Sequence, residues 1–241
     1  MRKVVRTVQA FCALAAVSLP CIGAQAETPI TLAMPSFEGA SAEAFQVNGD
    51  ATVSGGDLRL TKDAPFLWGA ALNTNFTTLG SEASFSSYFT FSIYSAVAGT
   101  GMGADGLAFL VQTNLTSKPG EGRTLGYAGA GPSVAIEFDT YMNGDSGDVN
   151  DNHIGINLNG STKSVAQTPA PFKLNNGSIY HAWVDYDGTK GVLEVRLSDS
   201  EKRPAQPTLA HTINLTDIFP GAVFVGFSGA TGAGHEEHGV K

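Results

Sequence analysis

The sequence predicts one all-β domain, a jelly-roll sandwich of antiparallel sheets, behind an N-terminal signal peptide. The chain of 241 residues contains 29 glycines and only 15% charged residues, which is typical of short strands joined by tight turns. Apolar residues make up 42% of the chain, enough for a substantial core. Beyond residue 26 no stretch shows the 3.6-residue periodicity of an amphipathic helix. Short strands at regular spacing without helices between them indicate a sandwich or jelly roll.

Residues 1–26 have the features of a secretory signal peptide. Arg2, Lys3 and Arg6 form a positive start, an apolar stretch follows, and Ala24-Gln25-Ala26 supplies the small residues of a cleavage site. The apolar stretch is far shorter than the ~20 residues that a membrane span needs. We therefore expect a secreted, periplasmic or extracellular protein with no membrane span, and the short, Ala-rich leader resembles a bacterial one.

The expected mature domain covers residues 27–241. The net charge of -8 becomes -11 once the three basic residues of the leader are removed. Because a domain with this negative net charge would not neutralise phosphates, the charge argues against nucleic acid as a partner. Both cysteines, Cys12 and Cys21, lie in the leader, so the domain must be held together by its core, by metal ions or by both.

Apolar patterns broken by turn residues predict the strands. Ser54-Gly55-Gly56-Asp57 predicts a hairpin turn, and the alternation of residues 84–94 predicts a half-buried strand. Asp187-Gly188 predicts a second hairpin between two further strands. Residues 107–111, 134–138 and 154–158 are continuous apolar runs, as in strands buried on both faces, and residues 223–227 form the last expected strand.

The densest cluster of candidate ligands lies between the expected strands at 134–138 and 154–158. Glu137 and Asp139 are two residues apart on a strand, so their carboxylates point to one face and repel each other unless a cation lies between them. Oxygen ligands suit Ca²⁺, and an imidazole beside carboxylates suits Mn²⁺ or another transition-metal ion. The calcium set would be Asp139, Asn143, Asp148 and the Tyr141 carbonyl, and the transition-metal set Glu137, Asp139, Asp148 and His153. An acidic, solvated loop without metal is the alternative.

This segment resembles the metal-binding signature of the legume lectin, or L-type lectin, family. Residues 134–143 read Val-Ala-Ile-Glu-Phe-Asp-Thr-Tyr-Met-Asn, against the family's Val-Ala-Val-Glu-Phe-Asp-Thr-aromatic-x-Asn, and residues 153–156 match its His-Ile-Gly-Ile. In the family an Asp lies five residues before the His, which selects Asp148 over Asp145 and Asp151. Further blocks follow in the family's order, at residues 104–109, 122–126, 183–188 and 226–232 and at Glu236-x-His238-x-Val240.

The resemblance implies a concanavalin A-like jelly roll with a shallow carbohydrate site that performs no catalysis. Asp105 would accept hydrogen bonds from sugar hydroxyls, after a cis peptide bond between Ala104 and Asp105. The other implied contacts are a backbone N–H of Arg123, the amide of Asn143, the ring of Tyr141 and a specificity-determining wall at Ala233 and Gly234. The implied cofactors are Ca²⁺ and Mn²⁺ or another transition-metal ion. The implied partners are glycans, and assembly into a homo-oligomer is left open.

Two other function classes are alternatives. A glycoside hydrolase of the same architecture needs two carboxylates flanking the scissile bond, and one jelly-roll family of such enzymes resembles Glu-x-Asp-x-(x)-Glu on a single strand. Here Thr140, Tyr141 and Met142 follow Asp139, so the third carboxylate is missing. The histidines at 181, 211, 235 and 238 have no nucleophile motif beside them and are interpreted as surface or strand-packing residues. The second alternative is a structural or adhesive surface protein that has lost sugar binding.

One departure from the family pattern concerns the C-terminus. The family continues after its Glu-x-His-x-Val signature with a strand similar to Leu-Ser-Trp-Ser-Phe, whereas this sequence ends at Lys241. A missing strand would expose unpaired backbone and apolar surface. We therefore expect either a truncated chain or another segment in the place of the last strand.

Overall fold

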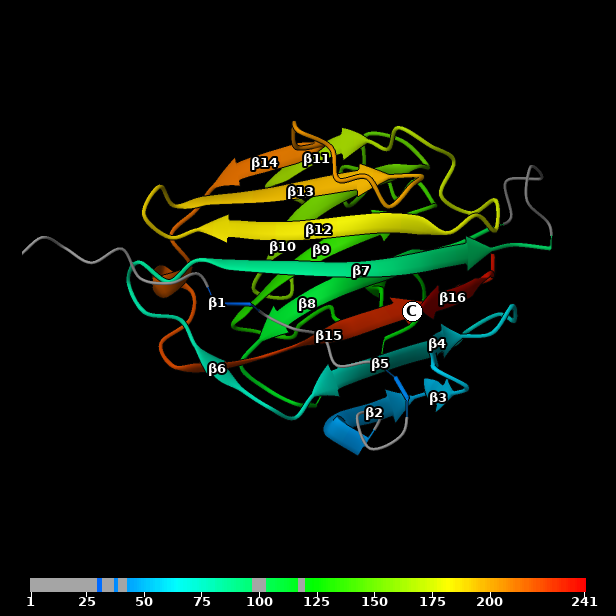
Figure 1. Cartoon of the computed structure of the whole chain (residues 1–241). Helices are drawn as coiled ribbons and strands as arrows, with labels where there is room; N and C mark the ends of the chain where they lie inside the picture. The colour runs from blue at the N-terminus through cyan, green and yellow to red at the C-terminus, as the bar shows by residue number, and fades with distance from the viewer. Residues whose placement is uncertain (1–29, 32–36, 39–42, 97–102, 117–119) are drawn as a thin grey trace, which may run out of the picture.

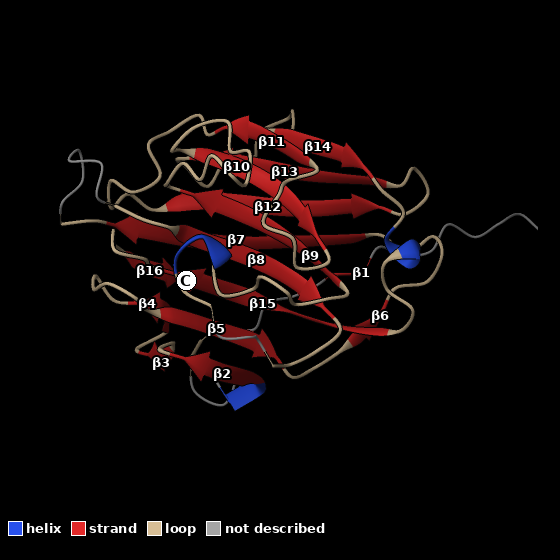
Figure 2. Ribbon diagram, turned by 180° about the vertical axis from the view of Figure 1, so that it is seen from behind, coloured by secondary structure: helices blue, strands red, loops and turns tan. Residues whose placement is uncertain are grey.

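The computed structural model describes residues 30–31, 37–38, 43–96, 103–116 and 120–241. The expected signal peptide and both cysteines lie outside the described residues. Two sheets pack face to face, as Figures 1 and 2 show from opposite sides. Within the described part of the chain, no helix is long and apolar enough to cross a membrane.

The first sheet is built around the long strand β7 (Phe85–Tyr94). Its order is β14 (Leu209–Thr212), β13 (Val192–Ser198), β12 (Tyr180–Asp187), β7, β16 (Glu237–Val240), β4 (Asp57–Thr61) and β3 (Thr52–Ser54). These strands pair antiparallel, and β1 (Ile30–Thr31) pairs parallel with the start of β7. Buried and more exposed residues alternate along β7, as the sequence predicts, because one face of this sheet lies on the core.

The second sheet carries the acidic segment. Its order is β11 (Ala166–Pro169), β10 (His153–Leu158), β9 (Ser133–Asp139), β8 (Gly106–Gln112), β15 (Ala222–Ala230), β5 (Trp68–Asn73) and β2 (Phe45–Gly49), all antiparallel, with β6 (Thr77–Thr78) paired to β15. Every residue of β8 and β9 is buried, as their continuous apolar runs predict.

Two apolar clusters explain why these central strands are buried on both faces. Phe109 and Phe138 pack between the sheets, together with residues such as Phe89 and Phe227. On the opposite face of the second sheet, Leu110 and its neighbours pack under Leu125 and Tyr127. The segment that contains the 3₁₀ turn η2 (Gly122–Thr124) is therefore held over the sheet, and Gly122 lies near Asp105, just before the start of β8.

Both predicted hairpins are present, one with a two-residue turn and the other with a four-residue loop. Gly55 and Gly56, with φ of 62° and 86°, form a two-residue turn between β3 and β4, where Ser54 pairs with Asp57. Between β12 and β13 the pairing closes at Asp187 and Val192, which leaves a four-residue loop. The Asp187 side chain accepts hydrogen bonds from the Thr189 and Lys190 amides and so organises this longer loop.

The C-terminal strand β16 lies between β7 and β4. Past its end, the backbone N–H of Lys241 donates to the Thr90 carbonyl at 2.9 Å. Farther along the same edge of β7, β1 pairs with Phe85 and Ser86. β16 and β1 thus pair with different stretches of β7.

Candidate functional site

The strand register brings the expected metal ligands to one end of the second sheet. His153 on β10 lies opposite Asp139 on β9, and Gly155 lies opposite Glu137. Residues directly opposite each other share a face, so all three functional side chains point the same way. A methyl group at Gly155 would lie 2.2 Å from Glu137 Oε1 and 2.4 Å from Ser164 Oγ. Only glycine at this position leaves room for the Glu137 carboxylate.

The loop after β9 returns Asp148 to this cluster. The Asn143 amide donates to Asp148 Oδ2 at 2.5 Å, which fixes the aspartate against the start of the loop. Single ligand atoms of Asp139, Asp148 and His153 all lie within 4.8 Å of one another. His153 Nε2 is 3.6 Å from Glu137 Oε1 and 3.9 Å from Asp148 Oδ1. The four residues expected to bind a transition-metal ion therefore converge.

Hydrogen bonds orient the His153 ring. Its Nδ1 lies 2.9 Å from the Asn150 carbonyl, and because a carbonyl only accepts, Nδ1 carries the proton. In the neutral ring Nε2 then has a free lone pair. Within the described residues this buried Nε2 has no hydrogen-bond partner. A metal-binding histidine is held in the same way, by a backbone carbonyl on its other nitrogen.

The electrostatics of the cluster also suit a cation. Burial, and next the charge of Glu137, raise the pKa of Asp139 well above its usual value. Burial also raises the pKa of Asp148. For His153 burial works against the charged ring, but the neighbouring Glu137 and Asp148 outweigh it and raise its pKa. A divalent cation would compensate these crowded carboxylates.

Glu137 is fixed by three neutral side chains. Asn157 Nδ2 and the Tyr127 hydroxyl donate to its Oε2 at 2.7 and 3.2 Å, and Ser164 Oγ donates to its Oε1 at 2.7 Å. None of these partners carries a positive charge. They therefore position the carboxylate and leave its charge available to an ion.

Asp105 lies beside this cluster, at the start of β8. The peptide bond between Ala104 and Asp105 is cis, as the resemblance implies. The Thr140 amide donates to the Asp105 carbonyl at 2.9 Å, which joins Asp105 to the residue between Asp139 and Tyr141. Burial, followed by the charge of Glu236, raises the pKa of Asp105 to about 7. Among the described residues its buried Oδ2 has no hydrogen-bond partner.

Two glycine-containing loops approach the Asp105 carboxylate. Added Cβ atoms at Gly122 and Gly232 would lie 3.6 and 3.2 Å from Asp105 Oδ2. The first loop places Arg123 near the site, and its side chain forms an ion pair with Asp145 of the acidic loop. The second continues into Ala233, which is exposed, and Gly234, which is half-buried.

Tyr141 and Asn143 complete the group of residues expected to bind sugar. The Tyr141 amide donates to Asp139 Oδ1 at 2.8 Å, and the residue is 41% exposed. Asn143 is half-buried. Asp105, Arg123, Tyr141, Asn143, Ala233 and Gly234 thus lie on adjoining loops at one end of the second sheet, next to the acidic cluster.

A buried polar network beneath these loops was not predicted. Glu236 is fully buried, and it accepts hydrogen bonds from the Thr140 hydroxyl and from Asn175 Nδ2 at 3.1 Å. His238 Nε2 is 3.1 Å from Glu236 Oε1, and His238 Nδ1 is 2.6 Å from the Thr61 hydroxyl. The available signal was the Glu-x-His spacing, which places Glu236 just before β16 and His238 within it. His238 was interpreted as a surface or strand-packing residue, and it packs within the strand layer.

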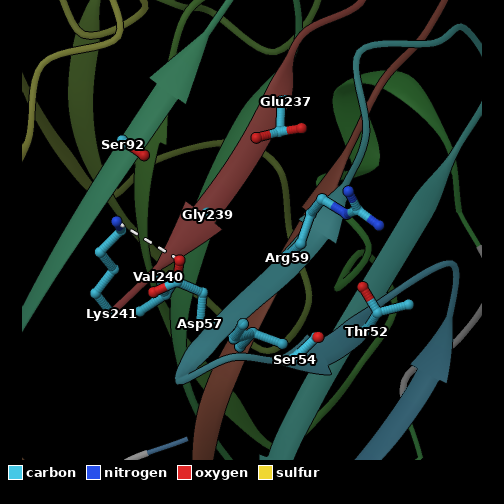
Figure 3. Close-up of a pocket in the computed structure, with 10 residues that line it drawn as sticks. Thr52, Ser54, Asp57, Arg59, Ser92, Glu237, Gly239, Val240 and Lys241 are labelled. Atoms are coloured by element: carbon cyan, nitrogen blue, oxygen red, sulfur yellow. Dashed lines mark ion pairs between the residues drawn. The ribbon is translucent and has the colours of Figure 1, made fainter.

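Another pocket, of about 380 Å³, lies on the first sheet and is not part of this cluster. Figure 3 shows Arg59, Asp57, Glu237 and Lys241 around it. Lys241 Nζ is 3.6 Å from Asp57 Oδ2. The pocket carries charges of both signs, and its lining includes no residue of the acidic cluster.

Comparisons with known proteins show the family to which the chain belongs. The legume lectin domain family matches residues 31–241. A lectin-like protein of Arabidopsis thaliana is 32% identical over 222 residues, which cover 79% of this chain and 80% of that protein. The L-type lectin-domain containing receptor kinase VIII.1 of the same plant is 35% identical over 80% of this chain. The chain spans only 29% of that receptor kinase.

Solved structures show the same fold. The basic winged bean lectin with Tn-antigen superposes with a TM-score of 0.70 at 31% identity, over 82% of this chain and 90% of that one. The Bauhinia forficata lectin in complex with GalNAc superposes with a TM-score of 0.70 at 29% identity, over 86% and 93%. The two-sheet architecture is thus that of these lectins.

Proposed function

Since the chain belongs to the legume lectin domain family, we propose that it is a carbohydrate-binding lectin whose shallow sugar site is organised by two metal ions. The proteins of this family that the comparisons return are lectins and lectin-domain proteins. The domain itself is a lectin domain and not an enzyme, which removes the glycoside hydrolase alternative. We also propose which ions it binds, which residues bind the sugar and where the protein is located.

The observation that carries the metal proposal is the free Nε2 of His153 among three carboxylates. A buried imidazole whose Nδ1 is tied to a carbonyl, beside buried carboxylates with raised pKa, fits a transition-metal ion such as Mn²⁺. Glu137, Asp139, Asp148 and His153 would hold it. Asp139 and Asp148, with Asn143 and the Tyr141 carbonyl, would hold Ca²⁺. Bound ions would fix the polar loop that carries Tyr141 and Asn143.

The sugar-binding roles follow from the same loops. Asp105 would accept hydrogen bonds from hydroxyls, and Asn143 and the backbone N–H of Arg123 would donate them. Tyr141 would lie against the apolar face of the sugar, with Ala233 and Gly234 as the wall beside it. Each hydrogen bond from the protein to a sugar hydroxyl replaces a hydrogen bond between that hydroxyl and water. We therefore expect a Kd on the order of 0.1–1 mM for a monosaccharide. Several sites on one particle would raise the avidity.

The likeness to structures with Tn-antigen and with GalNAc makes galactose-type sugars the first candidates. The leader over residues 1–26 supports secretion to the periplasm or the outside of the cell. A bacterial source stays a prediction from that leader, and the relatives described above are plant proteins.

A glycan array on the mature protein, with Ca²⁺ and Mn²⁺ or with chelator, tests the proposal. We expect binding to a defined sugar class with the ions and its loss with chelator. The Asp105→Asn variant should lose binding while keeping its fold by circular dichroism. Absence of binding to any glycan in the presence of both ions would refute the proposed function.

A further inference from the structure

We propose that Asn143 is a site of spontaneous deamidation, a covalent change that would end sugar binding as the protein ages. Asn143 is followed by Gly144, and this reaction meets the least steric hindrance in an Asn-Gly pair because glycine has no side chain. The modification itself is argued from the geometry of the loop. Only its effect on sugar binding rests on the proposed function.

The reaction needs no reactant besides the chain and water. The backbone nitrogen of Gly144 attacks Cγ of the Asn143 side chain, and the new N–C bond closes a succinimide ring. The proton of the Gly144 N–H group ends on the leaving NH₂ group, which departs as ammonia. Water then opens the ring at one of its two carbonyls and leaves either aspartate or isoaspartate at position 143.

The acidic loop leaves both reacting groups free. Gly144 is exposed, and a methyl group added to it would have no heavy atom within 4 Å. In the part of the chain that the structure describes, neither the Asn143 side-chain amide nor the Gly144 N–H has a hydrogen-bond partner. The Asn143 carbonyl accepts from the Ser146 and Gly147 amides at 2.9 and 3.2 Å, so the pair lies at the start of a surface turn. No hydrogen bond of either reacting group has to break before the attack.

The sequence contains three other Asn-Gly pairs, and in two of them the attacking nitrogen is already engaged. The Gly160 amide, after Asn159, donates to Ser133 Oγ at 2.9 Å. The Gly177 amide, after Asn176, donates to the Ile93 carbonyl at 2.9 Å. Asn176 is held as well, because its Oδ1 accepts from the Ser178 amide at 2.9 Å. Each of these contacts must break before a succinimide can form.

The third pair, Asn48-Gly49, lies at the end of β2 and is packed against its neighbours. Asn48 Nδ2 donates to the Gln46 and Leu115 carbonyls, at 3.4 Å in each case. A methyl group at Gly49 would lie 2.3 Å from the Trp68 carbonyl, which shows how closely the next strand approaches. The fold therefore restrains three of the four pairs and leaves Asn143-Gly144 open to reaction.

Deamidation would remove the group that the proposed sugar site needs at this position. A carboxylate has no N–H with which to donate to a sugar hydroxyl. It would also add a negative charge near Asp148, whose Oδ2 accepts from the Asn143 backbone amide. Isoaspartate would in addition lengthen the main chain and displace the turn that follows. A bound Ca²⁺ would hold the Asn143 side chain and should therefore slow the reaction.

Peptide mapping by mass spectrometry tests the modification. The folded full-length protein is incubated in mildly alkaline buffer with chelator, and each product is identified by the mass gained when NH₂ is exchanged for OH. We expect Asn143 to react at least tenfold faster than Asn48, Asn159 and Asn176, and all four to react within about threefold of one another in denatured protein. Addition of Ca²⁺ and Mn²⁺ should slow the reaction of Asn143 at least threefold and leave the other three rates unchanged.

Gly144→Ala links the modification to its consequence. The new methyl group fits, because the space around it is open and the backbone at Gly144 is not left-handed, but it hinders attack by the nitrogen. Fresh Gly144→Ala protein should bind the sugar found on the glycan array as wild type does, and it should keep this binding through an incubation in which wild type loses most of it. Asn143→Asp, which contains one product from the start, should not bind. Gly221→Ala, also in open space, is the matched control and should age as wild type does.

The outcomes separate this proposal from the proposed function. Equal rates at the four pairs of the folded protein, or a faster reaction at one of the other three, would overturn the proposal. Modification of Asn143 without loss of sugar binding, or at a rate that the ions do not change, would contradict the role given to Asn143 in the proposed function, and the modification site would stand. Failure of fresh protein to bind any sugar would reject the proposed function, and the four rates would still decide the modification.

Discussion

Replacing Asp148 by asparagine should have opposite effects on the metal-free and the metal-loaded protein. Without metal, burial and the nearby Glu137 raise the pKa of Asp148, so its charge costs free energy in the folded state. The asparagine would keep the size of the side chain and remove that cost. With metal, the same substitution removes a carboxylate ligand expected to bridge the two ions. We therefore expect the metal-free variant to be at least as stable as wild type, and the loaded variant to be less stable.

The size of the effect follows from linkage. An ion present at 100 times its Kd stabilises the folded state by about 2.7 kcal/mol. For a domain of this size, 1 kcal/mol shifts the thermal midpoint by roughly 2–4 °C. Each ion should thus raise the midpoint of wild type by about 5–11 °C, and the two together by roughly 10–22 °C. Loss of one bridging ligand should remove most of this increase.

Thermal unfolding at pH 7.5, with chelator and with 1 mM of both ions (on the order of 100 times an expected Kd near 10 µM), measures the two effects. Asp145→Asn is the matched control, because Asp145 lies in the same loop but pairs with Arg123 at the surface. It should keep the full metal-dependent increase. The reasoning is refuted if Asp148→Asn responds to the ions as wild type does, or if Asp145→Asn loses the response instead.

Three further predictions concern the same region. Gly155→Ala should lower the metal-dependent increase in midpoint and cost about 1–3 kcal/mol in stability, since the new methyl group would overlap the Glu137 carboxylate; denaturant titration with and without ions measures both. Because the pKa of Asp105 is raised to about 7, its contribution to the stability of the metal-free protein is full below pH ~4 and is lost as the pH rises through 7, up to roughly 4 kcal/mol. Urea titrations in chelator from pH 4 to 8 should show this fall, and Asp105→Asn should flatten it. Glu236→Ala should cost about 3–5 kcal/mol in the free energy of unfolding because it leaves buried donors and His238 without their carboxylate, whereas Glu237→Ala at the next position should change little.

The sequence predicted the central strands well because their pattern is local. The alternation along β7 and the apolar runs of β8 and β9 reflect one-sided and two-sided burial, which needs no knowledge of distant partners. The clustering of Asp139 and His153 was also predictable, since an antiparallel pair of strands joined by one loop places the end of one strand opposite the start of the next.

Other features depend on contacts between segments far apart in the sequence. Lys173 and Asn175 come from the loop between β11 and β12, which carries no motif, and only the folded chain brings them to Tyr141. The contact of Glu236 with Thr140 joins residues 96 positions apart. The Asp187 hairpin was predicted from its local turn signal, and the hydrogen bonds that the Asp187 side chain accepts within its four-residue loop became visible only in the structure.

The loop from Gly232 to His235 is anchored at both ends. At one end the Phe66 amide donates to the Gly232 carbonyl at 3.0 Å, and at the other Glu236 enters the buried network. Ala233 and Gly234 lie between these two anchored residues. Under the proposed function, exchanges at these two positions would change the ligand preference while the residues on either side stay in place, which makes this short stretch a place to engineer selectivity.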